Sequence, residues 1–203
     1  MNERKTDIWD SVEQFRQVHF VDLGKVPVDV LTVIEVRLRL DVIPFDRLFE
    51  KYSVDAAVMP DFSGIYVDKR SYRFLEGQPP WLFNRLRFSL AHELGHILLH
   101  REKAGDVRFK TLEDYRVWMR RYEASRYGLE WEANEFAGRL LIPIDRLRTD
   151  FDNFVQGVCK SFPVWWANAN LREALCSQLG ESYGVHKDVV SCRLDREELW
   201  PNP

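Results

Sequence analysis

The strongest constraint on the fold is a pair of histidines, four residues apart, in a segment with helical spacing. Apolar residues recur there every three or four positions up to His100, at Leu86, Leu90, Leu94, Ile97 and Leu98. Side chains four apart lie on one helical face, so His92 and His96 can bind one zinc ion while Glu93 points towards its water. The pattern predicts a long buried helix with two metal ligands and Glu93 as the general base.

The alternative explanation of this spacing is chance, because composition alone would produce it in on the order of one chain in a hundred of this length. The helical context and a second apolar helix further on favour a metal site. Gly95 lies inside the motif, and glycine is unfavourable in a helix interior. We therefore expect a neighbouring element or a substrate to approach closely there.

A second apolar helix is predicted over residues 129–141, ending near Ile142 because the next residue is a proline. It offers two carboxylates as the third ligand that a catalytic zinc site needs. Glu130 shares a face with small and apolar residues, namely Ala133, Asn134, Ala137 and Leu141, whereas Glu132 lies on the charged side with Glu135 and Arg139. We expect Glu130 to face inward and bind the metal, with Glu132 as the alternative ligand.

Other polar side chains around the motif are expected either to support the metal ligands or to have a structural role. Asn134, one turn after Glu130, is expected to hydrogen-bond a metal-bound imidazole. His100 continues the four-residue series but lies about 12 Å along the helix from His92, too far for the same site. A hydrogen bond at the helix end, or a structural contact, is expected for His100, and His19 and His186 are also interpreted as structural.

The rest of the chain predicts a mixed α+β protein. Helical spacing covers residues 6–19, and Asp29 caps a helix that runs into a short strand by residue 43. Residues 64–68 give the clearest strand, starting at Gly64. Thr111 and Asp114 form a capping box for a helix that includes Tyr115, Trp118 and Tyr122 and closes at Gly128. Residues 145–203 are expected to be helical and aromatic, with Trp165, Trp166 and Trp200 as packing anchors.

Composition restricts the class of protein. A formal charge of −3 provides no overall attraction to phosphate, so direct nucleic-acid binding is not expected. The three cysteines are widely spaced, which indicates free thiols in a reducing compartment. The chain starts without a signal-peptide pattern and has no stretch of roughly 18 apolar residues. We expect a cytoplasmic protein that does not enter a membrane.

Two segments together resemble a known family. The run RFSLAHELGHILLH at residues 87–100, followed by EWEANEFAGRLLIP at residues 130–143, is similar to the paired signature of the ImmA/IrrE metallopeptidases. Weaker similarity extends to GIYVD at residues 64–68 and to residues 181–194. The long stretch between the two segments, with an aromatic and basic helix around residues 118–126, departs from the family pattern and is expected either to cover the cleft or to be a solvated insertion.

The resemblance implies a thermolysin-like (gluzincin) core with a small sheet, two zinc-bearing helices and a helical C-terminal extension. We expect a core at residues 1–148 and an extension at residues 149–203 packed on it, or a single domain over 1–203. The strand of Gly64 and Tyr66 would border the cleft as an exposed edge that binds an extended substrate. One Zn²⁺ per chain is expected, with Mn²⁺ as an alternative ion in vitro.

The resemblance also implies an activity. Family members cut a helix-turn-helix repressor, usually encoded nearby, and thereby relieve repression of stress, mobile-element or phage-defence genes. The expected function is therefore site-specific zinc-dependent proteolysis. Stabilising the oxyanion requires a further donor, and spacing does not choose among Tyr122, Tyr127 and the arginines.

A different class of protein remains open. The chain could be a zinc-containing transcriptional regulator or sensor that binds DNA or a repressor without proteolysis. Residues 183–194 would then be a remnant of a helix-turn-helix, with Gly184 at the turn and a helix from Lys187. Only Lys187 and Arg193 are basic in that helix, which is sparse for a DNA reader.

Overall fold

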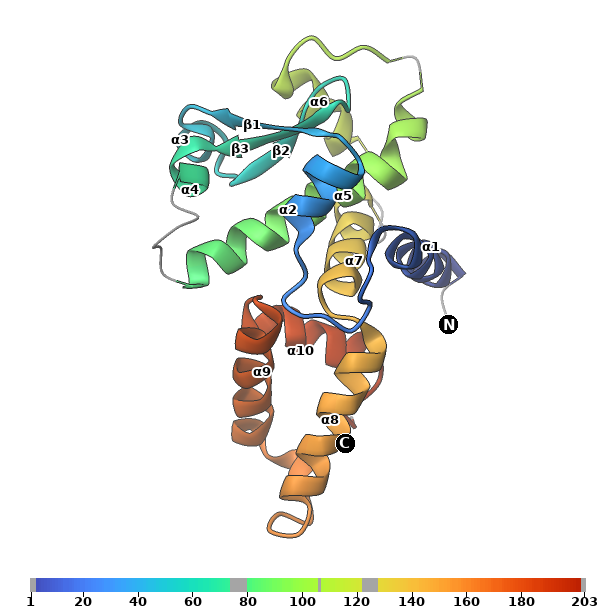
Figure 1. Cartoon of the computed structure of the whole chain (residues 1–203), viewed down its shortest axis with the longest axis vertical. Coiled ribbons are helices and arrows are strands. Elements are labelled where there is room, and N and C mark those ends of the chain that lie inside the picture. Colours follow the sequence, from blue (N-terminus) through green and yellow to red (C-terminus); the bar gives the residue numbers. More distant parts are fainter. Residues whose placement is uncertain (1–2, 74–79, 106, 122–127, 202–203) are drawn as a thin grey trace.

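Helices dominate the fold, and three strands form one small sheet beside them (Figure 1). The structure is a computed structural model that describes residues 3–73, 80–105, 107–121 and 128–201. In chain order the elements are α1 (Glu3–His19), α2 (Val30–Thr32), η1 (Val33–Arg37), β1 (Asp41–Phe45), α3 (Leu48–Tyr52), β2 (Ala56–Val58), β3 (Gly64–Asp68), α4 (Lys69–Arg73), α5 (Pro80–Ala104), α6 (Leu112–Arg120), α7 (Leu129–Leu141), α8 (Ile144–Val158), η2 (Trp165–Ala167), α9 (Ala169–Tyr183) and α10 (Lys187–Arg196).

The sheet has the strand order β1-β3-β2, with β1 parallel and β2 antiparallel to β3. The expectation that the strand of Gly64 and Tyr66 forms an exposed edge was therefore wrong, because β3 is the central strand. Tyr66 packs against Phe45 of β1, with ring centroids 5.2 Å apart. The β-forming residues after Gly64 located the strand, but only the pairing shows which strand has a free edge.

Gly64 is required where β1 and β3 meet. A Cβ atom at this position would lie 2.2 Å from the backbone oxygen of Asp41, well inside contact distance. We predict that Gly64→Ala lowers the free energy of unfolding by about 1–3 kcal/mol, the usual cost of overpacking. A Cβ atom on Gly157 of α8 would meet no other atom within 4 Å, so Gly157→Ala should instead stabilise by about 0.5–1 kcal/mol. Urea unfolding of both variants checks the pair, and equal effects would contradict the steric argument.

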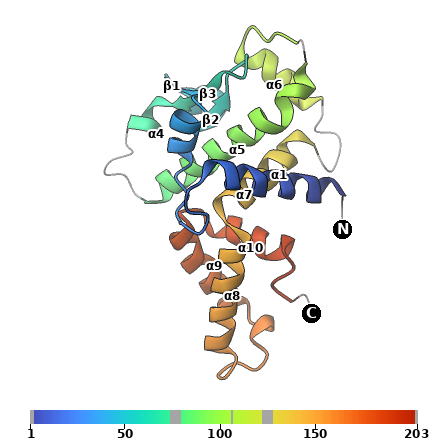
Figure 2. The same ribbon diagram turned by 45° about the vertical axis from the view of Figure 1, so that its right-hand side comes forward.

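The two helices that carry the metal motif pack closely against each other (Figures 1 and 2). A Cβ on Gly95 of α5 would lie 3.2 Å from the Cα of Ala133 and 3.1 Å from the ring of Phe136, both on α7. Ala133 and Ala137 are fully buried. The close approach expected at Gly95 is confirmed, and the approaching element is a helix, so α5 and α7 can present side chains to one point.

The C-terminal helices lie on the other side of α7 from the sheet (Figure 1). Buried ion pairs connect them to the core: Arg139 of α7 and Arg193 of α10 both donate to Glu197, and Arg139 also donates to Glu13 of α1 at 3.0 Å. Trp165 and Trp200 pack edge to face at 5.0 Å. The expected division after residue 148 falls inside α8 and stays a prediction.

Several local expectations are confirmed, and others fall outside the described residues. Asp29 caps α2, the capping box of Thr111 and Asp114 opens α6, and α7 spans the expected residues. The expectation that the helix opened by Thr111 closes at Gly128 was wrong, because α6 ends at Arg120 and Gly128 is the N-cap of α7. Residues 122–127, including Tyr122, are outside the described part. Over the described ranges, we find no helix that is both long and apolar enough to cross a bilayer.

Candidate metal centre

The side chains of His92, His96 and Glu130 converge where α5 and α7 pack together. The two Nε2 atoms lie 2.9 Å apart, and Oε2 and Oε1 of Glu130 lie 3.2 Å and 3.6 Å from Nε2 of His92 and His96. For three ligands of a tetrahedral ion with bonds of 2.0–2.1 Å, the donor atoms are about 3.3 Å apart. The three measured distances bracket that value, so this donor set fits a zinc-sized ion.

Each imidazole uses its other nitrogen for a hydrogen bond that directs Nε2 towards Glu130. Nδ1 of His92 lies 3.0 Å from Oδ1 of Asn134, the residue expected to support a metal-bound ring. Nδ1 of His96 lies 2.8 Å from Nδ1 of His100. Metal-binding histidines usually have such a partner on the second nitrogen.

Glu132, the alternative ligand, faces away from this group. Its Oε2 lies 2.8 Å from Nε2 of His100 and accepts a hydrogen bond from Lys103 at 2.7 Å. The expectation that the charged side of α7 faces outward was wrong, because Glu132, Glu135 and Arg139 are all buried. The side chain of Glu130 is 47% exposed and that of Glu132 is 4% exposed. The direction of the side chain, and not its burial, brings Glu130 into the group that could hold a metal.

Burial and mutual contacts set the charge states of the group. Burial lowers the pKa of His96 to about 4, which leaves this ring neutral and able to bind a metal at neutral pH. Burial also lowers the pKa of His100. Burial alone would raise the pKa of Glu130, but the hydrogen bonds from His92 and His96 outweigh it and hold this pKa below its ordinary value. Burial alone would lower the pKa of His92, but the hydrogen bond to Glu130 outweighs it and raises this pKa. Negative charge is thus concentrated on the carboxylate, as a cation site requires.

Glu93 lies beside the metal group and is held by the sheet. Its Oε2 accepts a hydrogen bond from the backbone N–H of Val58 in β2 at 2.8 Å. Burial raises the pKa of Glu93 to about 7, although the charge of His92 opposes this shift. A carboxylate with a pKa near neutrality is well matched to general base catalysis.

The group opens into a cleft of about 390 Å³ between β2, α5, α6 and α7, a size typical of ligand sites. Its walls include Ala56, Ala57, Tyr115, Arg116 and Arg120. α6 therefore borders the cleft, which agrees with one of the two expectations for the long insertion as far as Arg120. Residues 122–126 of the expected helix lie outside the described residues.

Tyr115 was missed as a candidate by the sequence analysis. Its hydroxyl is buried and has no hydrogen-bond partner among the described residues. Burial, and then the charges of Glu93 and Glu130, raise the pKa of Tyr115, so it remains a protonated donor. Tyr122 and Tyr127, named earlier as candidate donors, lie outside the described residues. In the sequence, Tyr115 and Trp118 lie three residues apart on one helical face, and this spacing indicated only that both side chains pack against the core.

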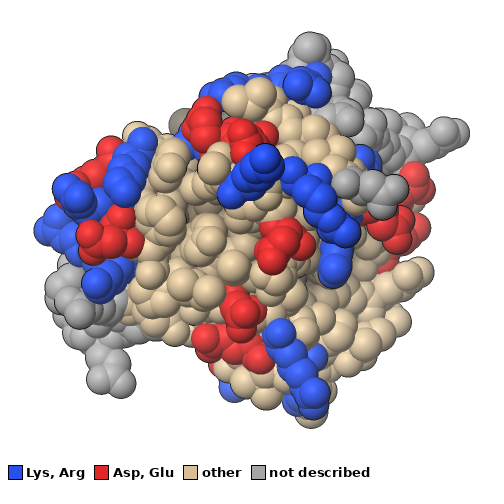
Figure 3. Space-filling view, turned by 90° about the horizontal axis from the view of Figure 1, so that it is seen from above, with Lys and Arg blue, Asp and Glu red and all other residues tan. Residues whose placement is uncertain are grey.

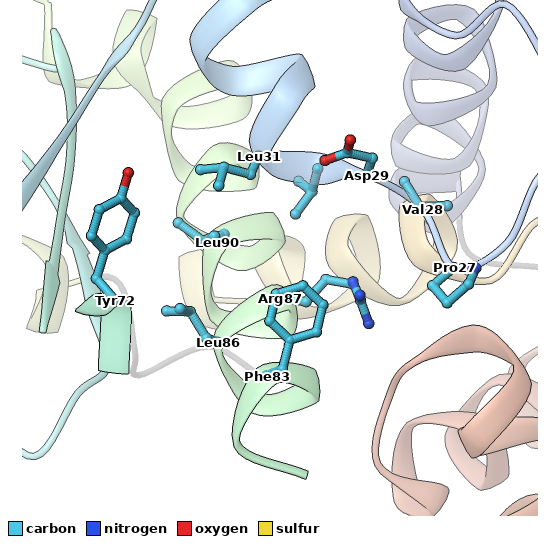
Figure 4. A pocket seen from close by; sticks show the side chains of 10 residues that line it. Pro27, Val28, Asp29, Leu31, Tyr72, Phe83, Leu86, Arg87 and Leu90 are labelled. Carbon is cyan, nitrogen blue, oxygen red and sulfur yellow. The ribbon is translucent and has the colours of Figure 1, made fainter. Parts of the chain in front are cut away.

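A second cavity of about 280 Å³ lies beside the N-terminal half of α5 (Figure 4). It is lined mainly by apolar side chains, including Tyr72, Leu86 and Leu90, and by Arg87, which donates to the backbone oxygen of Gly184 at 2.7 Å. His92, His96, Glu93 and Glu130 do not line it. The metal centre belongs to the other cleft.

Two imidazoles and a carboxylate around one point, with a buried glutamate beside them and an open cleft in front, define a metallopeptidase type of site. The model of the Peptidase_M78 family, described as the IrrE N-terminal-like domain, matches residues 84–195. This is more than half of the 203-residue chain, and the chain belongs to this ImmA/IrrE metallopeptidase family. A comparison with curated proteins found no match.

Proposed function

We propose that this protein is a zinc-dependent endopeptidase with a thermolysin-like site that cuts a helix-turn-helix repressor in the cytoplasm. The convergence of His92, His96 and Glu130 beside Glu93 carries the proposal, because a purely structural metal site has no use for a buried carboxylate next to an open cleft. Family membership supports the peptidase class. The repressor is inferred from the family resemblance.

The residues of the chain divide the proposed work among them. His92, His96 and Glu130 would hold the ion, and Asn134 orients the ring of His92. When bound, zinc supplies Lewis acidity for the attack of water on a peptide carbonyl. Glu93 takes one proton from the attacking water and returns it to the leaving amine. We assign Tyr115 as the donor that stabilises the carbonyl oxygen, since its hydroxyl is neutral and has no described partner.

The free edge of β2 is the proposed place for the substrate backbone. β2 pairs with β3 through the backbone groups of its flanking residues, because Asp68 N donates to Asp55 O at 2.8 Å and Met59 N donates to Gly64 O at 2.9 Å. Backbone groups alternate along a strand, so those of Ala56 and Val58 point to the opposite edge. Val58 N already bonds Glu93 there. An extended peptide added at Ala56 would run directly past the metal group.

The regulator alternative receives partial support from the fold. A turn at Gly184, whose φ angle is +64°, joins α9 to α10, and this order of elements is the one that the alternative expects. The three basic residues of α10 are all paired with carboxylates, however. Arg193 is buried and bonds Glu197, Lys187 bonds Glu173 at 2.6 Å, and Arg196 lies 2.9 Å from Glu135. The face shown in Figure 3 also mixes acidic and basic side chains. Among the described residues, neither α10 nor the face in Figure 3 has the dense row of basic side chains that phosphates need, so proteolysis is the better proposal.

The proposal is tested by comparing new protein N-termini in cells that express the wild type or Glu93→Gln. We expect a fragment of a repressor with the wild type alone, because only the wild type has the general base. Metal content is measured for both proteins and should be equal. If both hold zinc and no cleavage difference appears, also under stress, the regulator alternative becomes the better account.

A further inference from the structure

Three buried side chains form a hydrogen-bonded chain that leads from the metal group into the protein. His96, His100 and Glu132 have side chains that are 2%, 0% and 4% exposed. Nδ1 of His96 and Nδ1 of His100 are 2.8 Å apart, and Nε2 of His100 and Oε2 of Glu132 are also 2.8 Å apart. Lys103 closes the chain by donating to the same oxygen of Glu132 at 2.7 Å.

The proton positions in this chain follow from its chemistry. Oε2 of Glu132 accepts the hydrogen bond from Lys103 and lies 2.8 Å from Nε2 of His100. The same oxygen is therefore the acceptor towards His100, and Nε2 of His100 carries the proton between them. A neutral His100 then has a lone pair on Nδ1. One proton must lie between the two Nδ1 atoms, and it therefore belongs to His96. Nε2 of His96, which faces Glu130, is left with its lone pair free.

We propose that His100 and Glu132 are positioning residues that hold the proton of His96 on Nδ1 and so keep its Nε2 available for the metal ion. The inference rests on the proposed metal site. In this proposal three side chains of α7 support the site. Glu130 is part of the donor group, Asn134 orients His92, and Glu132 orients His96 through His100. A series of three histidines four residues apart on α5 is thereby explained, although His100 itself does not reach the metal group.

Two substitutions of His100 separate this role from simple packing. Leucine fills the space but neither accepts from His96 nor donates to Glu132. The amide of glutamine can do both. Ile97→Val is a control for general loss of packing on the same helix, because Ile97 is 5% exposed and is not part of the chain.

The first readout is zinc affinity, measured by competition with a chromophoric chelator. We expect His100→Leu to bind zinc about 10–100-fold more weakly, the usual cost of removing the partner of a metal-binding histidine. His100→Gln should recover most of that loss, and Ile97→Val should bind zinc as the wild type does. Glu132→Gln should give an intermediate loss, because an amide oxygen still accepts from His100 without the charge.

The second readout is the imidazole ¹⁵N NMR spectrum of the metal-free proteins. We expect His96 of the wild type to show a protonated Nδ1 and an unprotonated Nε2, and His100→Leu to lose this single tautomer. If His100→Leu does not fold, the comparison is made with His100→Gln and Glu132→Gln. Wild-type zinc affinity in folded His100→Leu, or a proton on Nε2 of His96 in the wild type, would overturn the proposal. Neither readout needs a substrate, so absence of proteolysis with these results intact would count against the proposed function alone.

Discussion

Glu93→Gln is expected to lower the rate of repressor cleavage by about 10²–10⁴-fold, the usual contribution of a positioned general base. The substitution removes the proton acceptor but should preserve the structure, because the amide oxygen of glutamine can still accept the hydrogen bond from Val58 N. Zinc affinity should therefore match that of the wild type. Single-turnover cleavage of the repressor found in the N-terminus comparison, with purified protein, measures the loss directly.

A suitable control for this substitution lies on the same helix. Glu102 is an exposed residue near the end of α5 and does not line the cleft, so Glu102→Gln makes the same chemical change outside the site. Its cleavage rate should equal that of the wild type. If Glu93→Gln retains more than about one third of the wild-type rate, Glu93 is not the general base. A loss of about three-fold or less is far smaller than the loss expected when such a base is removed.

Glu130→Gln is expected to have the largest effect on metal binding. Replacing an anionic ligand by a neutral amide should weaken zinc binding by more than the ~10–100-fold that follows from losing a hydrogen-bond partner of a ligand. At a zinc concentration of 100 times the wild-type Kd, zinc stabilises the wild type by about 2.7 kcal/mol, and a 100-fold weaker variant gains only about 0.4 kcal/mol. Thermal unfolding with and without zinc gives both values, and cleavage should be lost together with the metal.

Glu132→Gln is the matched comparison, because it makes the same change two residues away on α7. Its carboxylate bonds His100 and Lys103 and does not face the metal group. Zinc should still stabilise this variant, although less than the wild type. If Glu132→Gln loses zinc and Glu130→Gln keeps it, the ligand assignment must be exchanged between the two residues.

Local chemistry in the sequence was sufficient for much of the site. The spacing of His92, Glu93 and His96 depends only on the pitch of one helix, and α5 does present the two rings to one point. Helical spacing also led to Glu130, since a residue one turn before Asn134 shares its face. Gly95 indicated a close neighbour because a helix has no local reason for a glycine. In each case a short segment contains the whole physical cause.

Features that involve two or more distant segments were decided by tertiary structure. The sequence placed Glu132 on an outer charged side, but His100 and Lys103 of α5 surround it, and a helical wheel cannot show which side of a helix another helix covers. Gly64 and Tyr66 were expected at an edge, but strand order depends on pairing with β1 and β2. Tyr115 looked like a packing residue until α6 was placed over the cleft.

The sequence by itself determined the two helices of the candidate metal site, the positions of His92, Glu93 and His96 on one of them, and the family, because these follow from spacing within continuous segments. Only the tertiary structure decided that β2 and not β3 has the free edge, that Val58 holds Glu93, and that His100 joins Glu132 to His96. The physical reason is that hydrogen bonds between distant segments depend on how the chain packs, and packing is a property of the whole core rather than of any one segment.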